Sequence, residues 1–297
     1  MLELGAKDRR IVVLDADLSK STQTVRFADR FPERFFDCGV AEQNLMGTAA
    51  GLAASGKIVF VSTFAIFASG RAFEQVRNTI AYGELNVKIC PSHGGISVGE
   101  DGSSHQALED VALMRAVPKM RVIVPADYYQ ARDAVKAAAY IDGPFYIRMS
   151  RPSVPAIYGE DYRFELGKAP VLREGEDVSI LACGIVLGEA LEAAELLAGD
   201  GIQAEVLDMV CVKPMDSESV LKSCEKTGRV ITVEDHSITG GLGGAVAELL
   251  AEKSCGRLYR IGIRDEFGVS GSVRGLMEHF GLTASSIARV AREMCGS

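Results

Sequence analysis

Residues Gly39 to Phe64 read GVAEQNLMGTAAGLAASGKIVFVSTF, a helical pattern that leads directly into a strand pattern. An apolar stripe at the spacing of one helix face is formed by Leu45, Thr48, Ala49 and Leu52. Residues 58–64 then form a short apolar run, as expected for a strand buried on both faces. A helix joined to such a strand indicates a parallel sheet that is covered by helices.

The same alternation continues along the chain in two series. In the first series, further apolar runs lie at residues 11–15, 87–90, 121–125 and 145–149, with helical patterns at 71–82, 107–116 and 130–139. In the second series, strand patterns lie at 178–182, 204–207, 230–233 and 258–263, with helical patterns at 188–197, 219–224 and 243–251. We therefore predict an α/β protein with two doubly wound domains. They span residues 1–155 and 173–297 and are joined by a Pro- and Gly-punctuated linker at 156–172.

Composition excludes several classes of protein. Hydrophobic residues make up 47% and charged residues 24% of the chain, which is the balance of a globular protein rather than a disordered one. The net charge is −8 and no basic block occurs, so neither nucleic-acid binding nor membrane-surface binding is expected. Seven widely spaced cysteines without a C-x-x-C motif argue against a disulfide framework or a zinc site. The first ten residues lack the apolar core of a signal peptide, and we expect a reducing, cytoplasmic location.

Two features near the opening stretch are candidates for a ligand site. Glu42 lies at the predicted start of the helix, where a carboxylate commonly interacts with the helix dipole. The alternative is that this carboxyl group faces a pocket. Phe64 and Phe67 follow the strand and serve either ordinary core packing or a wall for a planar ligand.

The most informative stretch is the Gly-rich loop between His93 and His105, HGGISVGEDGSSH. Its glycines let the backbone turn tightly and approach a ligand, and it follows a predicted strand, where ligands bind in open α/β sheets. Asp101 lies inside the loop. A solvated loop with incidental histidines is the alternative, and the spacing fits no common zinc motif.

Three further residues follow predicted strands and suit an anion. Arg148 and Arg151 flank the end of the last strand of the first series, where guanidinium groups could bind a phosphate or a carboxylate; the alternative is that they form surface ion pairs. Ser21 follows the first strand and would donate to the same anion. The Gly-rich segment 240–244, by contrast, lacks G-x-G-x-x-G spacing, so we predict tight helix–strand packing there.

Taken in order, these motifs resemble the C-terminal two-thirds of a transketolase, from about Ile11 onward. The matching strings are VAEQN (40–44), STF (62–64), SH (92–93), SVGEDG (97–102), IRMSRP (147–152), and TVEDH (232–236) with GGLG (240–243). The resemblance implies a pyrimidine-binding domain followed by a transketolase C-terminal-like domain.

The resemblance also implies roles for individual residues. Thiamine diphosphate would be the cofactor, with Glu42 hydrogen-bonded to its aminopyrimidine and Phe64 and Phe67 packed on that ring. His93 and His105 would act as catalytic groups near substrate oxygens. The substrate itself, a phosphorylated sugar, would be bound by Ser21, His93, Asp101, His105 and Arg151. The reaction would transfer a two-carbon ketol unit between such sugars.

Two departures from the family pattern shape the prediction. Many transketolases carry a tyrosine where this chain has Gly70. The diphosphate-binding domain, with its Gly-Asp-Gly…Asn metal motif, has no counterpart here, because Gly199-Asp-Gly201 is followed by no asparagine. We therefore expect no metal ligands in this chain. A separate N-terminal subunit would supply the Mg²⁺ and diphosphate site, in an α2β2 assembly.

Other functions share part of this pattern. A 1-deoxyxylulose-5-phosphate synthase or a 2-oxo-acid dehydrogenase β subunit also has a glutamate in an equivalent helix, and a regulatory homologue would need no chemistry. His93 together with Ser150-Arg-Pro152 favours a phosphorylated sugar over an oxo acid. The retention of Glu42, Asp101, His105 and Arg151 argues against a non-catalytic homologue.

Overall fold

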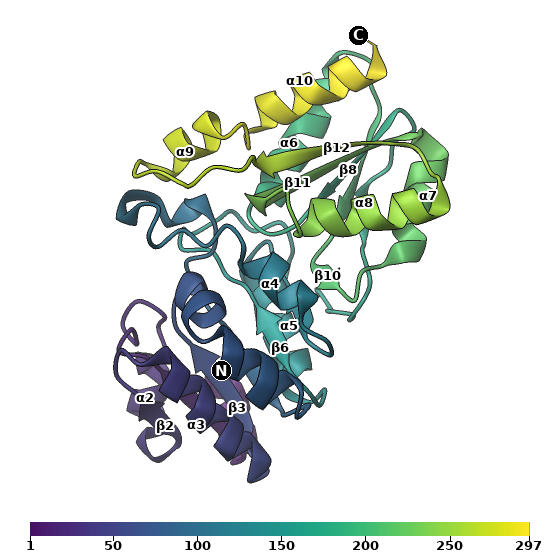
Figure 1. Cartoon of the computed structure of the whole chain (residues 1–297). Coiled ribbons are helices and arrows are strands. Elements are labelled where there is room, and N and C mark those ends of the chain that lie inside the picture. Colours follow the sequence, from purple (N-terminus) through teal and green to yellow (C-terminus); the bar gives the residue numbers. More distant parts are fainter. Residues whose placement is uncertain (297) are drawn as a thin grey trace.

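The runs predicted as strands form two separate sheets in the computed structural model, which describes residues 1–296 (Figure 1). Each sheet is parallel apart from one antiparallel edge strand, and helices cover both faces, so the predicted α/β class with two doubly wound sheets is confirmed. Ser297, the last residue of the second predicted domain, lies outside the described residues. Within residues 1–296 no helix is long and apolar enough to cross a bilayer.

The first sheet has the strand order β10-β5-β6-β4-β3-β1-β2. Its strands are β1 (Ile11–Asp15), β2 (Phe35–Asp37), β3 (Ile58–Ser62), β4 (Val87–Ile89), β5 (Arg121–Ile123), β6 (Phe145–Ile147) and β10 (Cys211–Lys213). The edge strand β10 comes from the second half of the chain and pairs antiparallel with β5. The sequence pattern did not predict β10, because three residues are too few to show a period.

Helices pack on both faces of this sheet. They are α1 (Leu2–Lys7), α2 (Val25–Arg30), α3 (Glu42–Ala54), α4 (Asp110–Ala116) and α5 (Tyr128–Ala139). Short 3₁₀ turns lie at Pro32–Arg34 (η1) and Ile96–Asp101 (η4), and wide π-helical segments at Phe67–Arg71 (η2) and Gln75–Ala81 (η3). Along β1, Val12 and Leu14 belong to the core cluster with α3, while Ile11 and Val13 belong to the cluster on the other face. This alternation follows from the two-residue period of a strand.

The second sheet has the order β12-β11-β8-β9-β7, with β7 (Val171–Arg173) antiparallel to β9 at one edge. The other strands are β8 (Val178–Ala182), β9 (Ala204–Asp208), β11 (Arg229–Ser237) and β12 (Arg257–Ile263). Its helices are α6 (Val186–Gly199), α7 (Ser217–Thr227), α8 (Leu242–Lys253), α9 (Val273–His279) and α10 (Ala284–Cys295). Figure 1 shows α6 and α10 on one side of the sheet and α7 and α8 on the other.

Candidate active site

Four adjacent strands of the first sheet, β6, β4, β3 and β1, bring the predicted site residues to one edge. Because these strands are parallel, their carboxyl ends face the same way, and the loops that follow them lie next to one another. Ser21 follows β1, Phe64 follows β3, His93 follows β4 and Arg151 follows β6. This is the edge at which open α/β sheets bind ligands.

Aromatic rings form the centre of this edge. The ring of Phe64 stacks on the imidazole of His93, with centroids 3.9 Å apart, and lies nearly parallel to the ring of Phe67 at 6.1 Å. His105 meets both phenylalanine rings edge-on, at 6.2 Å from Phe64 and 5.4 Å from Phe67. The two histidines at the ends of the Gly-rich loop therefore converge on the two phenylalanines, although up to 41 positions separate them in sequence.

Glu42 is the first residue of α3, and its side chain is only 1% exposed. Arg71, at the end of η2, donates a hydrogen bond of 2.8 Å to the Glu42 carboxylate. The same guanidinium lies 4.5 Å above the Phe67 ring, a cation–π contact. Arg71 thus connects the buried carboxylate to the aromatic wall, a role that the sequence reasoning missed. No local pattern connects Arg71 with Glu42, because 29 positions separate them in sequence.

The second domain holds the Gly-rich loop in place. The buried carboxylate of Asp235, on β11, accepts hydrogen bonds from the backbone N–H groups of Ile96 at 2.8 Å and Ser97 at 3.4 Å. Gly95 has φ of +79°, and a side chain there would collide with this carboxylate. Glycine is therefore required for both the backbone conformation and the close approach. The sequence motifs assign no role to Asp235.

The two arginines that follow β6 differ in their surroundings. Arg148 is buried, pairs with Asp110 at 2.8 Å, and donates to the backbone oxygens of Ala107 and Asp235. The expectation that Arg148 would bind an anion is therefore wrong, because the side chain is buried and its Nε and Nη2 donors are occupied between the two domains. Arg151 is 40% exposed at its side chain, lies 3.9 Å from Asp101 and donates to the backbone oxygen of Val98.

Ser21 lies in the loop that follows β1, at the same edge of the sheet as the other predicted residues. It is exposed, and its loop is held by Asp15, which accepts hydrogen bonds from Leu18 N at 2.6 Å, Thr22 Oγ1 at 2.7 Å and Thr24 Oγ1 at 2.8 Å. Within residues 1–296 no hydrogen bond joins Ser21 to His93 or Arg151.

The electrostatic setting keeps His93 neutral. Burial, together with the nearby positive charge of Arg151, lowers the pKa of His93 to about 4. Its Nδ1 lies 2.8 Å from Ser92 Oγ. A neutral imidazole with a hydroxyl neighbour can donate or accept a hydrogen bond near pH 7 without carrying a charge.

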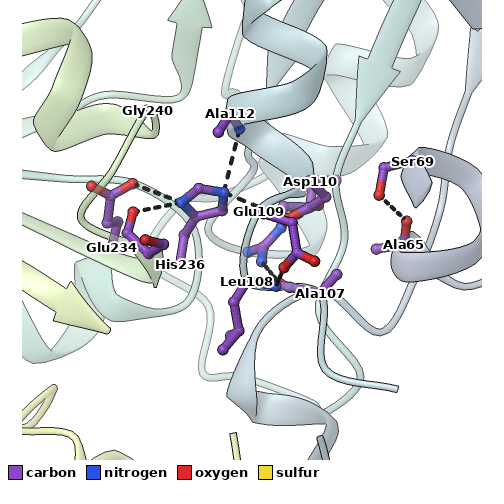
Figure 2. Close-up of polar contacts among 12 residues, drawn as sticks. Ala65, Ser69, Ala107, Leu108, Glu109, Asp110, Ala112, Glu234, His236 and Gly240 are labelled. Atoms are coloured by element: carbon purple, nitrogen blue, oxygen red, sulfur yellow. Dashed lines mark hydrogen bonds and ion pairs between the residues drawn. The ribbon is translucent and has the colours of Figure 1, made fainter. Parts of the chain in front are cut away.

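A buried polar network joins the two domains behind the loop (Figure 2). The carboxylate of Glu234 accepts from the backbone N–H groups of Leu242 and Gly243, each at 2.7 Å, and so caps α8. His236 lies between Glu234 and Asp110, as Figure 2 shows, and accepts from Ala112 N at 3.3 Å. Burial raises the pKa of Glu234 to about 7 and lowers that of His236 to about 4. The predicted tight packing at 240–244 is confirmed, because a side chain at Gly241 would collide with Glu234.

Two family models match most of the chain. One, described as the pyrimidine-binding domain of transketolase, matches residues 1–156, and the other, described as the transketolase C-terminal domain, matches residues 167–287.

Individual relatives match over nearly their whole length. A putative transketolase C-terminal section from Methanocaldococcus jannaschii is 53% identical, over 99% of this chain and 93% of that protein. The 6-deoxy-6-sulfo-D-fructose transketolase subunit SqwH from a Clostridium species is 50% identical, over 99% and 91% respectively. A solved structure described as a split gene transketolase, inactive beta4 tetramer, superposes with a TM-score of 0.92 at 52% identity. That match covers 99% of this chain and 95% of the other.

Proposed function

Because this chain belongs to the transketolase family, we propose that it is one subunit of a thiamine-diphosphate-dependent transketolase that transfers a two-carbon ketol unit between phosphorylated sugars. A separate subunit would carry the diphosphate-binding domain and the Mg²⁺ ligands. The proposal is supported by relatives named as a C-terminal section and as a subunit, which match this chain almost end to end. We assign residues 1–155 to the pyrimidine-binding domain, 156–172 to the linker and the remainder to the C-terminal domain.

The observation that carries the proposal is the buried carboxylate of Glu42 beside the parallel rings of Phe64 and Phe67. Within residues 1–296 its one side-chain hydrogen bond comes from Arg71 to Oε2, which leaves Oε1 available as an acceptor. A flat, apolar wall next to a carboxylate acceptor suits an aminopyrimidine, which presents an aromatic face and ring-edge polar atoms. The residues present therefore fit the pyrimidine half of thiamine diphosphate. When bound, that cofactor supplies a carbanion that attacks a ketose carbonyl.

Each residue near this wall has a proposed task. Glu42 holds a proton at the pyrimidine ring edge, and Phe64 and Phe67 bind the ring face. His93, which is neutral near pH 7, and His105 hydrogen-bond to substrate oxygens and move protons there. Asp101 accepts from a substrate hydroxyl group.

The substrate phosphate is proposed to lie farther out along the same edge of the sheet. Arg151, which keeps a partly exposed guanidinium, and Ser21, with an exposed hydroxyl, supply donors for an anion, together with His93. Binding energy from this remote group would orient the reacting carbonyl. The SqwH relative is named for a sulfonated sugar, which also carries an anionic group at its end.

Reconstitution tests the proposed function. The chain is mixed with a co-purifying diphosphate-binding subunit, thiamine diphosphate and Mg²⁺, and ketol transfer from a phosphorylated ketose to an aldose phosphate is followed. We expect transfer with both subunits and none with either alone. Full transfer by this chain alone would exclude the separate subunit. Decarboxylation of pyruvate without ketol transfer would instead indicate a synthase of the 1-deoxyxylulose-5-phosphate type.

A further inference from the structure

Two cysteines of the second domain lie in direct contact, away from the candidate active site. Cys224 is buried in the last turns of α7, and Cys255 is half-buried between α8 and β12. Their Sγ atoms are 2.7 Å apart although 31 positions separate them in sequence. All seven cysteines of the chain are free thiols, and within residues 1–296 no other pair of sulfur atoms is hydrogen-bonded.

The backbone on both sides fixes this contact. Cys255 N donates to Leu250 O at 3.0 Å, and Arg257 N donates to Gly228 O at 3.0 Å, so the segment before β12 is tied to the end of α7. Gly256 lies between them with φ of +60°, and a side chain there would collide with Cys224 Sγ. The two thiols are therefore held together by the fold itself and are not brought together by flexible side chains.

We propose that Cys224 and Cys255 form a redox site that a hydroperoxide converts into a disulfide. The half-buried Cys255 thiolate attacks one oxygen of hydrogen peroxide, the O–O bond breaks, and the leaving hydroxide takes up a proton to become water. The resulting sulfenic acid is attacked by the sulfur of Cys224, the S–O bond breaks, and a second water leaves with the Cys224 proton. Two thiols are oxidised by two electrons, and one peroxide is reduced to two waters.

The surroundings support this order of events. Burial, together with the neighbouring Cys255, raises the pKa of Cys224 to about 12, which makes it the poorer first nucleophile. Cys224 can still act as the second nucleophile despite its raised pKa. It is in contact with Cys255, so its attack on the Cys255 sulfenic acid needs no diffusion. The disulfide would join α7 to the segment that leads into the edge strand β12. Since no residue of the candidate active site takes part, ketol transfer should be unchanged while stability rises.

Treatment of the folded chain with hydrogen peroxide tests the proposal. We expect the free-thiol count to fall from seven to five, the mass to drop by two hydrogen atoms, and peptide mapping to yield a Cys224–Cys255 crosslink. The melting temperature should rise by roughly 5–10 °C and return after reduction with dithiothreitol. Cys255→Ser and Cys224→Ala should each abolish these changes, while Cys38→Ser, which removes another half-buried thiol, should leave them intact.

Other results would overturn the proposal. These are seven thiols remaining after treatment, a disulfide between two chains, or oxygen added to Cys255 without a crosslink. The thiol and mass measurements need neither cofactor nor a second subunit, so their outcome is independent of the proposed transketolase function.

Discussion

Substituting Asp235 with alanine should loosen the Gly-rich loop from a distance. The Asp235 carboxylate lies on β11 of the second domain and accepts the N–H groups of Ile96 and Ser97, between the two site histidines. In the variant, the buried N–H of Ile96 would have no acceptor. Leaving such a donor unpaired costs about 1–3 kcal/mol, and the long 3.4 Å contact to Ser97 adds little.

The closed loop should lose about 2 kcal/mol of stability in total, because removing a buried carboxylate also removes the cost of its desolvation. That cost is visible in the native protein, where burial raises the pKa of Asp235. The loss of about 2 kcal/mol corresponds to a roughly 30-fold increase in the equilibrium constant for opening the loop. If the closed loop is needed to place His93 and His105, kcat/KM for ketol transfer should fall by up to about the same factor. Asp235→Asn, which keeps one oxygen acceptor, should lose much less.

Hydrogen exchange measured on the chain alone separates this effect from catalysis. The Ile96 amide should exchange roughly 30-fold faster in Asp235→Ala than in the wild type. Asp200→Ala provides the matched control, because Asp200 belongs to the same domain but forms an exposed pair with Arg292. An unchanged exchange rate at Ile96, or an equal acceleration in the control, would refute the role assigned to Asp235.

Three further substitutions probe other parts of the structure. Arg71→Met removes the partner of Glu42 and should weaken thiamine diphosphate binding by about tenfold or more in calorimetry of the assembled enzyme. Arg77→Met, on the next segment η3, should not weaken it, because Arg77 pairs with its neighbour Asn78. Arg151→Met should raise KM for phosphorylated sugars by about tenfold with a smaller effect on kcat, and an equal change for unphosphorylated sugars would contradict its role. Burial lowers the pKa of Lys88 to about 7, so between about pH 7 and 10 the unfolded chain binds one more proton and stability rises with pH by about 1.4 kcal/mol per unit. Urea unfolding across this range should show a pH dependence of the unfolding free energy that is smaller by this amount in Lys88→Met than in the wild type. An identical pH dependence in the two proteins would contradict the lowered pKa of Lys88.

Much of the fold could be predicted from the sequence, because the spacing of apolar residues that marks a helix or a strand is set by residues close together in the chain. The run at 11–15 is β1 as predicted, and the helix after Gly39 begins at Glu42. The short edge strand β10 was missed, since its formation depends on pairing with β5 and not on any pattern in its three residues. Helices α9 and α10 were also absent from the prediction, although α10 has a clear apolar face buried against α6.

The site was predictable only in part, for a physical reason. Residues after neighbouring parallel strands must meet at one edge, so the convergence of Phe64, Phe67, His93 and His105 follows from the strand pattern. Burial and pairing between distant residues do not follow from it. Arg148 and Arg151 look alike in sequence, but only Arg148 is paired with the buried carboxylate of Asp110, which lies 38 positions away. Asp235 is 139 positions from the Ile96 amide it binds, so no local signal could connect them.

Ketol transfer by a Glu42→Gln chain, assembled with the diphosphate-binding subunit, thiamine diphosphate and Mg²⁺, tests the central claim most directly. The amide keeps the size of the side chain but cannot hold the proton at the pyrimidine edge as a carboxylate does. We predict a loss of at least about 100-fold in kcat, with assembly of the subunits unchanged. Wild-type turnover by the Glu42→Gln assembly would contradict the role of Glu42 and the function built on it.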